Sequence, residues 1–272
     1  MLFALIGIKR PKPKTRMGRI LRNGERVLFV LALLYIALIT YPNMLFAGQV
    51  SHGTIRLHMR NARIPDSATS IIDRAETLLK ACEFWDPSLR HDVFSCDGFS
   101  LFAFLCPRSR HSYAVANLGN VFLAKADFDR DVGFRNAPTE NTRALHTIIA
   151  HELTHNLLRV QLGFWRYRLL PTWKNEGYCE VISRGRSDGL QDDILKMAAT
   201  TNRRSKAYVY GKYRLLVAYL MQIKGLNFND IVALDDSQQE VETEMRHWAT
   251  NTDMSSNHVP EDTARKLADP QH

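Results

Sequence analysis

The sequence predicts an α+β domain that follows a single apolar segment near the N-terminus. Three observations lead to this class. Residues 53–60 alternate between apolar and polar side chains, as in a half-buried strand. Residues 111–128 form two strand-prone runs around the turn Leu118-Gly119-Asn120. Several longer stretches with helical periodicity come after them, and strands followed by successive helices are typical of α+β domains.

Positive charge is concentrated at the N-terminus. The chain of 272 residues has a net charge of +8, and residues 1–26, with eight Lys and Arg residues against Glu25, account for +7 of it. The remaining residues carry only +1. Because the main part of the chain is nearly neutral, no nucleic-acid partner is expected. Residues 1–26 are predicted to form a basic cytoplasmic tail.

An uncharged segment, VLFVLALLYIALITYPNMLFA, occupies residues 27–47. A helix of this length spans about 30 Å of hydrocarbon, so the membrane is an expected partner through this segment. The basic flank places the N-terminus in the cytoplasm and the following domain outside it, in a periplasm or lumen. The alternative is a signal peptide that is cleaved after Ala47 and releases a secreted domain. The long basic region and the large side chain of Leu45 favour an uncleaved signal-anchor.

The exported region is predicted to contain one folded domain over residues 48–247 and a loose polar tail over residues 248–272. Its four cysteines are Cys82, Cys96, Cys106 and Cys179. An exported location permits disulfides, and the short loop between Cys96 and Cys106 suits one. Four buried free thiols are equally compatible with the sequence. No feature of the sequence indicates an oligomeric state.

Four helices are expected in the domain. Their predicted limits are residues 67–82 with Ser67 as the cap, Pro138 and Thr139 to Gly163, a start near Asn175 after Pro171, and a start at about Ser205. The second of these has a continuous apolar stripe and contains the motif H-E-x-x-H at His151, Glu152 and His155.

Residues at i and i+4 lie about 40° apart around a helix, so His151 and His155 leave the same face and can reach one ion. Two neutral imidazoles of this kind bind zinc. Glu152 points to the adjacent flank, where a carboxylate can take a proton from a water molecule at an open zinc position. The apolar stripe lies elsewhere on the helix, so the core does not use the two histidines.

A catalytic zinc needs a third protein ligand. The metzincin pattern would require Gly and His at positions 158 and 161, where this chain has Leu158 and Gln161, so that class is excluded. Glu176, in LPTWKNEGYCEVIS, lies twenty-one residues after His155 on the first turn of the next expected helix. A carboxylate there can face back toward the histidines.

With both motifs the chain resembles the gluzincins, the thermolysin and aminopeptidase superfamily, in which a glutamate on a second helix follows H-E-x-x-H. The run PTWKNEG is similar to the W-x-N-E-G signature of the aminopeptidase branch. The resemblance covers about residues 110–225. It implies a zincin-like domain with a small mixed sheet, in a membrane-anchored bacterial-type member.

The resemblance also implies roles for individual residues. It implies one Zn²⁺ ion per chain bound by His151, His155 and Glu176, and Glu152 as general base. It further implies that the segment 120–128 is the sheet edge that pairs with an extended peptide substrate. An ordinary core strand is the alternative for that segment.

Two further residues are site candidates. In the aminopeptidase branch a tyrosine in a Y-x-x-G run stabilises the oxyanion, and YVYGKY offers Tyr208 with Gly211 at that spacing. Tyr210 and Tyr213 are close rivals. Glu180, one turn after Glu176, is a candidate to orient a ligating histidine by accepting its remaining N–H, and a solvated surface glutamate is the alternative.

The predicted function is that of a membrane-anchored zinc metallopeptidase that cuts a peptide or protein substrate outside the cytoplasm. The sequence leaves endopeptidase and exopeptidase activity open. Two other functions remain: a catalytically silent binding or assembly module on the same fold, and a zinc hydrolase of a non-peptide substrate.

Overall fold

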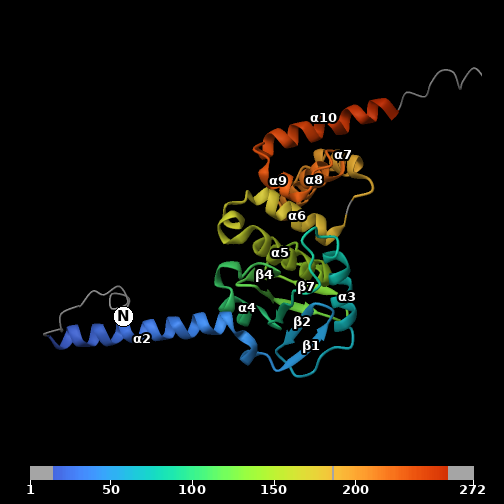
Figure 1. The fold of residues 1–272 in the computed structure, drawn as a ribbon. Helices are drawn as coiled ribbons and strands as arrows, with labels where there is room; N and C mark the ends of the chain where they lie inside the picture. Colours follow the sequence, from blue (N-terminus) through green and yellow to red (C-terminus); the bar gives the residue numbers. More distant parts are fainter. Residues whose placement is uncertain (1–14, 186, 257–272) are drawn as a thin grey trace, which may run out of the picture.

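A computed structural model describes residues 15–185 and 187–256 of the chain. Figure 1 shows an N-terminal helix that projects from the domain, a sheet region next to it, and layers of helices stacked beyond the sheet. The predicted α+β class is confirmed, with a mixed five-stranded sheet and a C-terminal helical region.

The projecting helix is α2 (Arg16–Thr40), which begins after Thr15 accepts a hydrogen bond from Gly18 N. It is long and apolar enough to cross a membrane, and none of its side chains is buried in the domain. The helix therefore begins within the predicted basic tail, at Arg16. It ends before Pro42, where the short 3₁₀ turn η1 (Pro42–Leu45) leads into the domain, because proline cannot continue the helical hydrogen bonding.

The main sheet has the strand order β1-β2-β3-β5-β4. Its strands are β1 (Gly48–His52), β2 (Ile55–Met59), β3 (His91–Ser95), β4 (Ala114–Asn117) and β5 (Asn120–Leu123). Strands β2, β3 and β5 are parallel to one another, while β1 and β4 run antiparallel at the two edges. The strand predicted at residues 53–60 is thus present as β2, and it forms a hairpin with β1.

The hairpin predicted over residues 111–128 is present as β4 and β5, with Leu118 and Gly119 at positive φ in a tight turn. The predicted exposed edge at 120–128 is wrong for the main sheet. Strand β5 lies between β3 and β4, so the edge on this side of the sheet is β4 and not β5. The chain then enters a second, three-stranded sheet of β6 (Lys125–Asp127), β7 (Val132–Phe134) and β8 (Thr142–Ala144).

The helices of the domain are α3 (Ala68–Leu79), α4 (Phe99–Leu105), α5 (Leu145–Leu169), α6 (Thr172–Arg184), α7 (Leu190–Ala198), α8 (Lys206–Gln222), α9 (Phe228–Ala233) and α10 (Gln238–Ser256), with the 3₁₀ turn η2 (Pro107–Ser109) after α4. Helix α10 extends into the segment predicted to be loose. Ser67 precedes α3 without capping it, because its hydroxyl donates to Asp129 instead.

Helix α5 differs from its predicted limits at both ends. It begins at Leu145 because residues 142–144 pair with β7 as strand β8. Gly163 bends the helix rather than ending it: its φ of 73° and ψ of 167° interrupt the helical path, and the chain resumes a helical course to Leu169. Glycine adopts such a conformation without the steric cost that a Cβ would impose.

The core lies on both faces of the sheet. Leu57, Val93 and Val121 point to the side covered by α3 and α5, while Phe94 and Phe122 point to the side of α4. Strands that are buried on both faces need such continuous apolar character. All four cysteines are free thiols and buried, so the free-thiol alternative describes this structure.

Candidate metal centre

The two histidines of the motif lie one turn apart on the buried face of α5. Ile149, Leu153 and Leu157 of the same helix pack in the core and fix its rotation. His151 and His155 are themselves nearly buried, and their rings meet edge to face with centroids 4.9 Å apart. The helix thus presents both rings to one point, as the spacing predicts.

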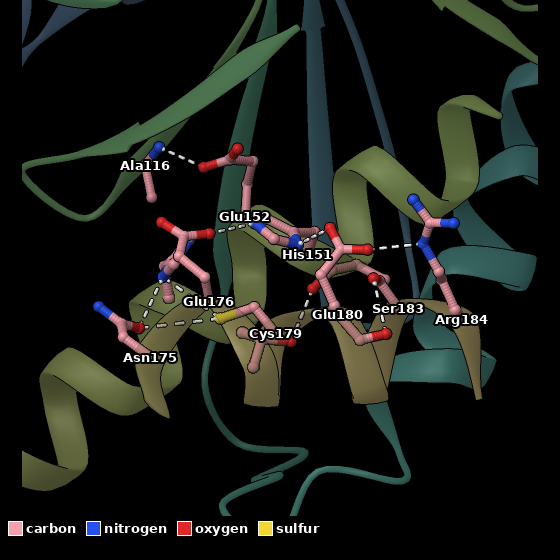
Figure 2. Close-up of polar contacts among 12 residues, drawn as sticks. Ala116, His151, Glu152, Asn175, Glu176, Cys179, Glu180, Ser183 and Arg184 are labelled. Carbon is pink, nitrogen blue, oxygen red and sulfur yellow. Dashed lines mark hydrogen bonds and ion pairs between the residues drawn. The ribbon is translucent and has the colours of Figure 1, made fainter. Parts of the chain in front are cut away.

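Glu176 reaches the same point from the first turns of α6. Its Oε2 atom lies 3.2 Å from His151 Nε2 and 3.6 Å from His155 Nε2. One donor atom from each of the three residues lies within 4.8 Å of the others. Figure 2 shows the carboxylate of Glu176 directed at His151 across the space between the two helices. The structure therefore brings together the three residues that the sequence proposes as ligands.

The residue after Glu176 is Gly177, and helix packing requires a glycine at this position. A Cβ at position 177 would lie 2.5 Å from the carbonyl oxygen of Tyr213 in α8 and 2.6 Å from a methyl group of Val217. Any larger residue would force α6 and α8 apart. Close packing of these helices therefore depends on Gly177. This packing fixes the position of α6 and with it that of Glu176.

Glu180 lies behind His151. Its Oε1 atom lies 3.1 Å from His151 Nδ1. The geometry of this contact is not that of a hydrogen bond, so the two groups form an ion-pair contact. The side chain of Glu180 is completely buried, and Arg143 Nη1 and Arg184 Nε donate to it at 2.7 and 2.6 Å. The solvated-surface alternative for Glu180 does not describe this structure.

A different group of side chains surrounds His155. Its Nδ1 atom lies 3.0 Å from Asn175 Oδ1, 3.2 Å from the Tyr167 hydroxyl and 3.3 Å from Cys179 Sγ. No motif in the sequence assigns any of these three residues to the site. Asn175 adjoins Glu176 in the motif and is the one that spacing could have indicated.

The electrostatics of the cluster follow from this packing. Burial by itself lowers the pKa of His151, but contacts with Glu176 and Glu180 outweigh it and raise the pKa to about 9. Burial raises the pKa of the Glu176 carboxyl, yet hydrogen bonds from His151 and His155 hold it well below its ordinary value. Without a cation, the cluster thus takes up a proton to balance its carboxylates.

Glu152 stands beside the cluster and contacts the edge strand. Its Oε2 atom accepts a hydrogen bond of 2.8 Å from the backbone N–H of Ala116 in β4. Figure 2 shows this carboxylate beside Ala116. The motif glutamate therefore faces away from the core, toward the open edge of the sheet.

A cavity of about 600 Å³ joins these groups. His151, Glu152, His155 and Glu176 line it, together with residues 114–116 of β4. Tyr210 and Tyr167 also line it, whereas Tyr208 and Tyr213 do not. Burial and the neighbouring carboxylates raise the pKa of Tyr210, so its phenol keeps its proton. Of the three tyrosines proposed from the Y-x-x-G run, Tyr210 is the one at the cavity, and the sequence selected Tyr208.

The residues fit a zinc ion. Each histidine directs Nε2 to the shared point and has an oxygen acceptor near Nδ1, an arrangement that leaves the Nε2 lone pair free for a metal. Two imidazoles and one carboxylate form the donor set of catalytic zinc sites, which keep a further position open. Here the open side is the cavity.

Comparison of the chain with models of protein families, with curated proteins and with solved structures finds no match. The case for a metal site therefore rests on the geometry of His151, His155 and Glu176.

Proposed function

We propose that this chain is a membrane-anchored zinc peptidase of gluzincin type whose site lies outside the cytoplasm. The observation that carries the proposal is the convergence of His151, His155 and Glu176 at one end of a cavity that Glu152 and an open edge strand also line. A donor set alone indicates a metal; a carboxylate and an unpaired strand beside it indicate peptide hydrolysis.

His151, His155 and Glu176 would hold the zinc ion. When bound, the ion supplies Lewis-acid chemistry: it polarises a carbonyl oxygen and makes a water molecule more acidic. Glu152 is the general base, since its carboxylate is at the cavity and is not a member of the ligand cluster. It takes the proton of the attacking water and later delivers it to the departing amine.

Strand β4 supports a peptide substrate. In an antiparallel pair, successive residues turn their backbone groups alternately toward and away from the partner. Tyr113 O accepts from Ala124 N, and Ala116 N bonds to Glu152 instead of β5. Ala114 and Ala116 therefore turn their backbone groups toward the cavity. An extended peptide can add to this edge through main-chain hydrogen bonds.

Tyr210 is the proposed oxyanion donor. Its phenol lines the cavity and stays protonated, so it can donate a hydrogen bond to a carbonyl oxygen that becomes negative. Tyr208, the earlier candidate, does not line the cavity. Tyr167 is placed differently, since its hydroxyl is engaged with His155.

The proposed location follows from α2 and its basic flank. The helix has the length and apolarity of a membrane span, and the eight Lys and Arg residues of positions 1–26 lie before it or in its N-terminal part. The N-terminus therefore lies in the cytoplasm, and the domain lies on the other side of the membrane. Peptidase activity is the preferred function. A non-peptide zinc hydrolase would use the same ligands, whereas a catalytically silent binding module would not need to keep any of them.

The experiment compares the purified full-length protein in lipid nanodiscs with Glu152→Gln. Zinc content is measured together with cleavage of casein and of a peptide library. We expect about one zinc per chain in both proteins and cleavage by the unchanged protein alone, because amide replaces the base without touching the ligands. Equal cleavage by both would refute the role of Glu152. Zinc without cleavage in either would indicate a binding module or a non-peptide hydrolase.

A further inference from the structure

Apart from Ile223, the exposed large hydrophobic side chains of the described domain lie in four segments: the residues directly after α2, helix α4, the β4–β5 turn and the second half of α5. Outside α2, they are Tyr41, Met44, Phe104, Leu118, Val160, Phe164, Trp165 and Leu169, with Ile223 as the exception elsewhere. We call the first eight residues the apolar patch. Trp165 and Leu169 are 73% and 79% exposed, far more than side chains of this kind in an ordinary protein surface.

Contacts connect α4, the β4–β5 turn and α5 to the C-terminal end of α2. Tyr41 and Met44 directly follow the helix. Phe104 of α4 packs edge to face against Tyr35 of α2, and its carbonyl oxygen accepts a hydrogen bond from the Tyr35 hydroxyl at 2.8 Å. Helix α4 therefore lies beside the last turns of the apolar helix.

The β4–β5 turn extends the connection to α5. Asn120 Nδ2 donates to Thr40 O, the last residue of α2, at 3.2 Å. Asn156 Nδ2 of α5 donates to Gly119 O at 2.9 Å. Leu118 is in this turn, and Val160 is one helical turn after Asn156. Figure 1 shows the connection from α5 to α6 on the side of the domain from which α2 projects.

The segments that form the patch are also basic. No Asp or Glu occurs in residues 98–126 or 153–175, which contain seven Lys and Arg residues. Arg166 and Arg168 alternate with Trp165, Tyr167 and Leu169 in the exposed continuation of α5. The remainder of the chain after residue 26 has a net negative charge, since the whole of it carries only +1.

We propose that the apolar patch rests on the outer surface of the same bilayer that α2 spans, with its aromatic side chains in the interfacial layer. This inference depends on the proposed membrane anchoring. Tryptophan and tyrosine favour the interface of a bilayer, and arginine beside them favours anionic lipid headgroups. We assign the patch to a lipid surface, and not to a protein partner, because the patch is continuous with the end of the anchor.

This docking determines where the cavity lies. The β4–β5 turn is next to Thr40, so the end of β4 at Asn117 is close to the membrane surface. A peptide bound along β4 would have one end at that surface. The site therefore works beside the bilayer instead of at the end of a free tether.

The test places one environment-sensitive fluorophore at a time on the full-length protein in vesicles that contain phosphatidylcholine and phosphatidylglycerol. The introduced sites are Leu169→Cys in the patch, Ile223→Cys as an exposed apolar control outside it, and Leu31→Cys in α2. The four native cysteines are buried, so the new thiol takes the label. Lipids with a nitroxide quencher near the headgroup or in the acyl chain report contact.

We expect lipid quenching of the labels at positions 169 and 31 and none at 223. Headgroup quenchers should act best on position 169, and acyl-chain quenchers on position 31. Quenching at 31 without quenching at 169 would overturn the docking and leave the anchor intact. Absence of quenching at 31 would overturn both proposals.

Two controls separate the other interpretations. The label at position 169 could also become shielded from water by a second copy of the chain. If its fluorescence changes only as the protein density in the vesicles rises, the patch contacts a second copy and the docking is wrong. Arg166→Glu with Arg168→Glu should reduce quenching at 169 in anionic vesicles without changing it at 31. Both arginines are exposed, so folding, monitored by thermal unfolding, should be retained.

Discussion

His151 Nε2 and Glu176 Oε2 approach to 3.2 Å, although the two residues belong to different helices. Helix α5 supplies the imidazole and helix α6 supplies the carboxylate. This contact joins the two sequence motifs. His155, on the same helix as His151, is the third member of the group.

The first prediction separates the two glutamates of α6. Glu176→Ala should abolish stoichiometric zinc binding, because it removes one of the three donors at the shared point. Glu180→Gln should retain zinc with an affinity lower by about 10–100-fold, the usual effect of losing the partner of a ligating histidine. Zinc content after dialysis and competition with a chelating dye measure both. Full zinc binding by the Glu176→Ala variant would show that Glu176 is not a ligand.

The second prediction concerns protons. The pKa of His151 is raised to about 9 in the metal-free protein, so the ring is protonated at pH 7.5. Zinc requires the neutral ring, and binding must therefore expel that proton. We expect release of about one proton from His151 per zinc below pH 9, with apparent affinity rising about tenfold per pH unit. Above pH 9 the release should vanish and the affinity should level off. Calorimetry in buffers of different ionisation enthalpy counts the protons, and a pH-independent affinity from pH 6 to 8 would contradict the shift.

The third prediction concerns helix packing. Gly177→Ala places a methyl group 2.5 Å from the carbonyl oxygen of Tyr213, and neither backbone can move without separating α6 from α8. We expect a loss of about 1–3 kcal/mol in the free energy of unfolding and weaker zinc binding. Denaturant unfolding with and without zinc measures this. Gly189→Ala is the matched control, because a Cβ there meets only ordinary contact at 3.9 Å.

The fourth prediction tests the edge strand. If a substrate peptide pairs with β4, alternate residues of the peptide donate their N–H groups to it. N-methylation along a cleaved peptide should therefore raise KM at every second position and have little effect between them. Uniform effects at all positions, or none, would show that the substrate does not bind as a strand.

The fifth prediction concerns the cysteines. Burial raises the pKa of the Cys106 thiol to about 12 and raises that of Cys96 further, so neither thiol forms an appreciable thiolate at neutral pH. We expect no reaction of the folded protein with a thiol reagent at pH 8 and four reactive thiols after denaturation. Two reactive thiols after denaturation without reductant would instead indicate a disulfide formed on export.

Much of the candidate centre could be predicted from spacing. The relation of His151 to His155 follows from helix geometry alone, and the helical periodicity around them is strong enough to ensure the helix. The position of Glu176 followed from the requirement for a third ligand and from the signature around it. These inferences depend on short segments whose local structure determines the direction of the side chains.

Other features depend on how distant segments pack. Strand β4 is a sheet edge and β5 is not, because β3 pairs with β5 although α4 and β4 lie between them in the sequence. Tyr210 reaches the cavity and Tyr208 does not, because the rotation of α8 against α6 is set by contacts such as that at Gly177.

The residue pattern was enough to indicate the N-terminal apolar helix, the α+β class and the three metal-binding candidates, since each depends on hydrophobic periodicity or helical spacing within one or two neighbouring segments. The environment of those candidates came from the folded chain. Arg143 comes to Glu180 from a strand of the second sheet, and the apolar patch gathers α4, the β4–β5 turn and α5 around the end of α2. Contacts between segments far apart in the sequence have no local signature, because they arise only when the core excludes water and brings those segments together.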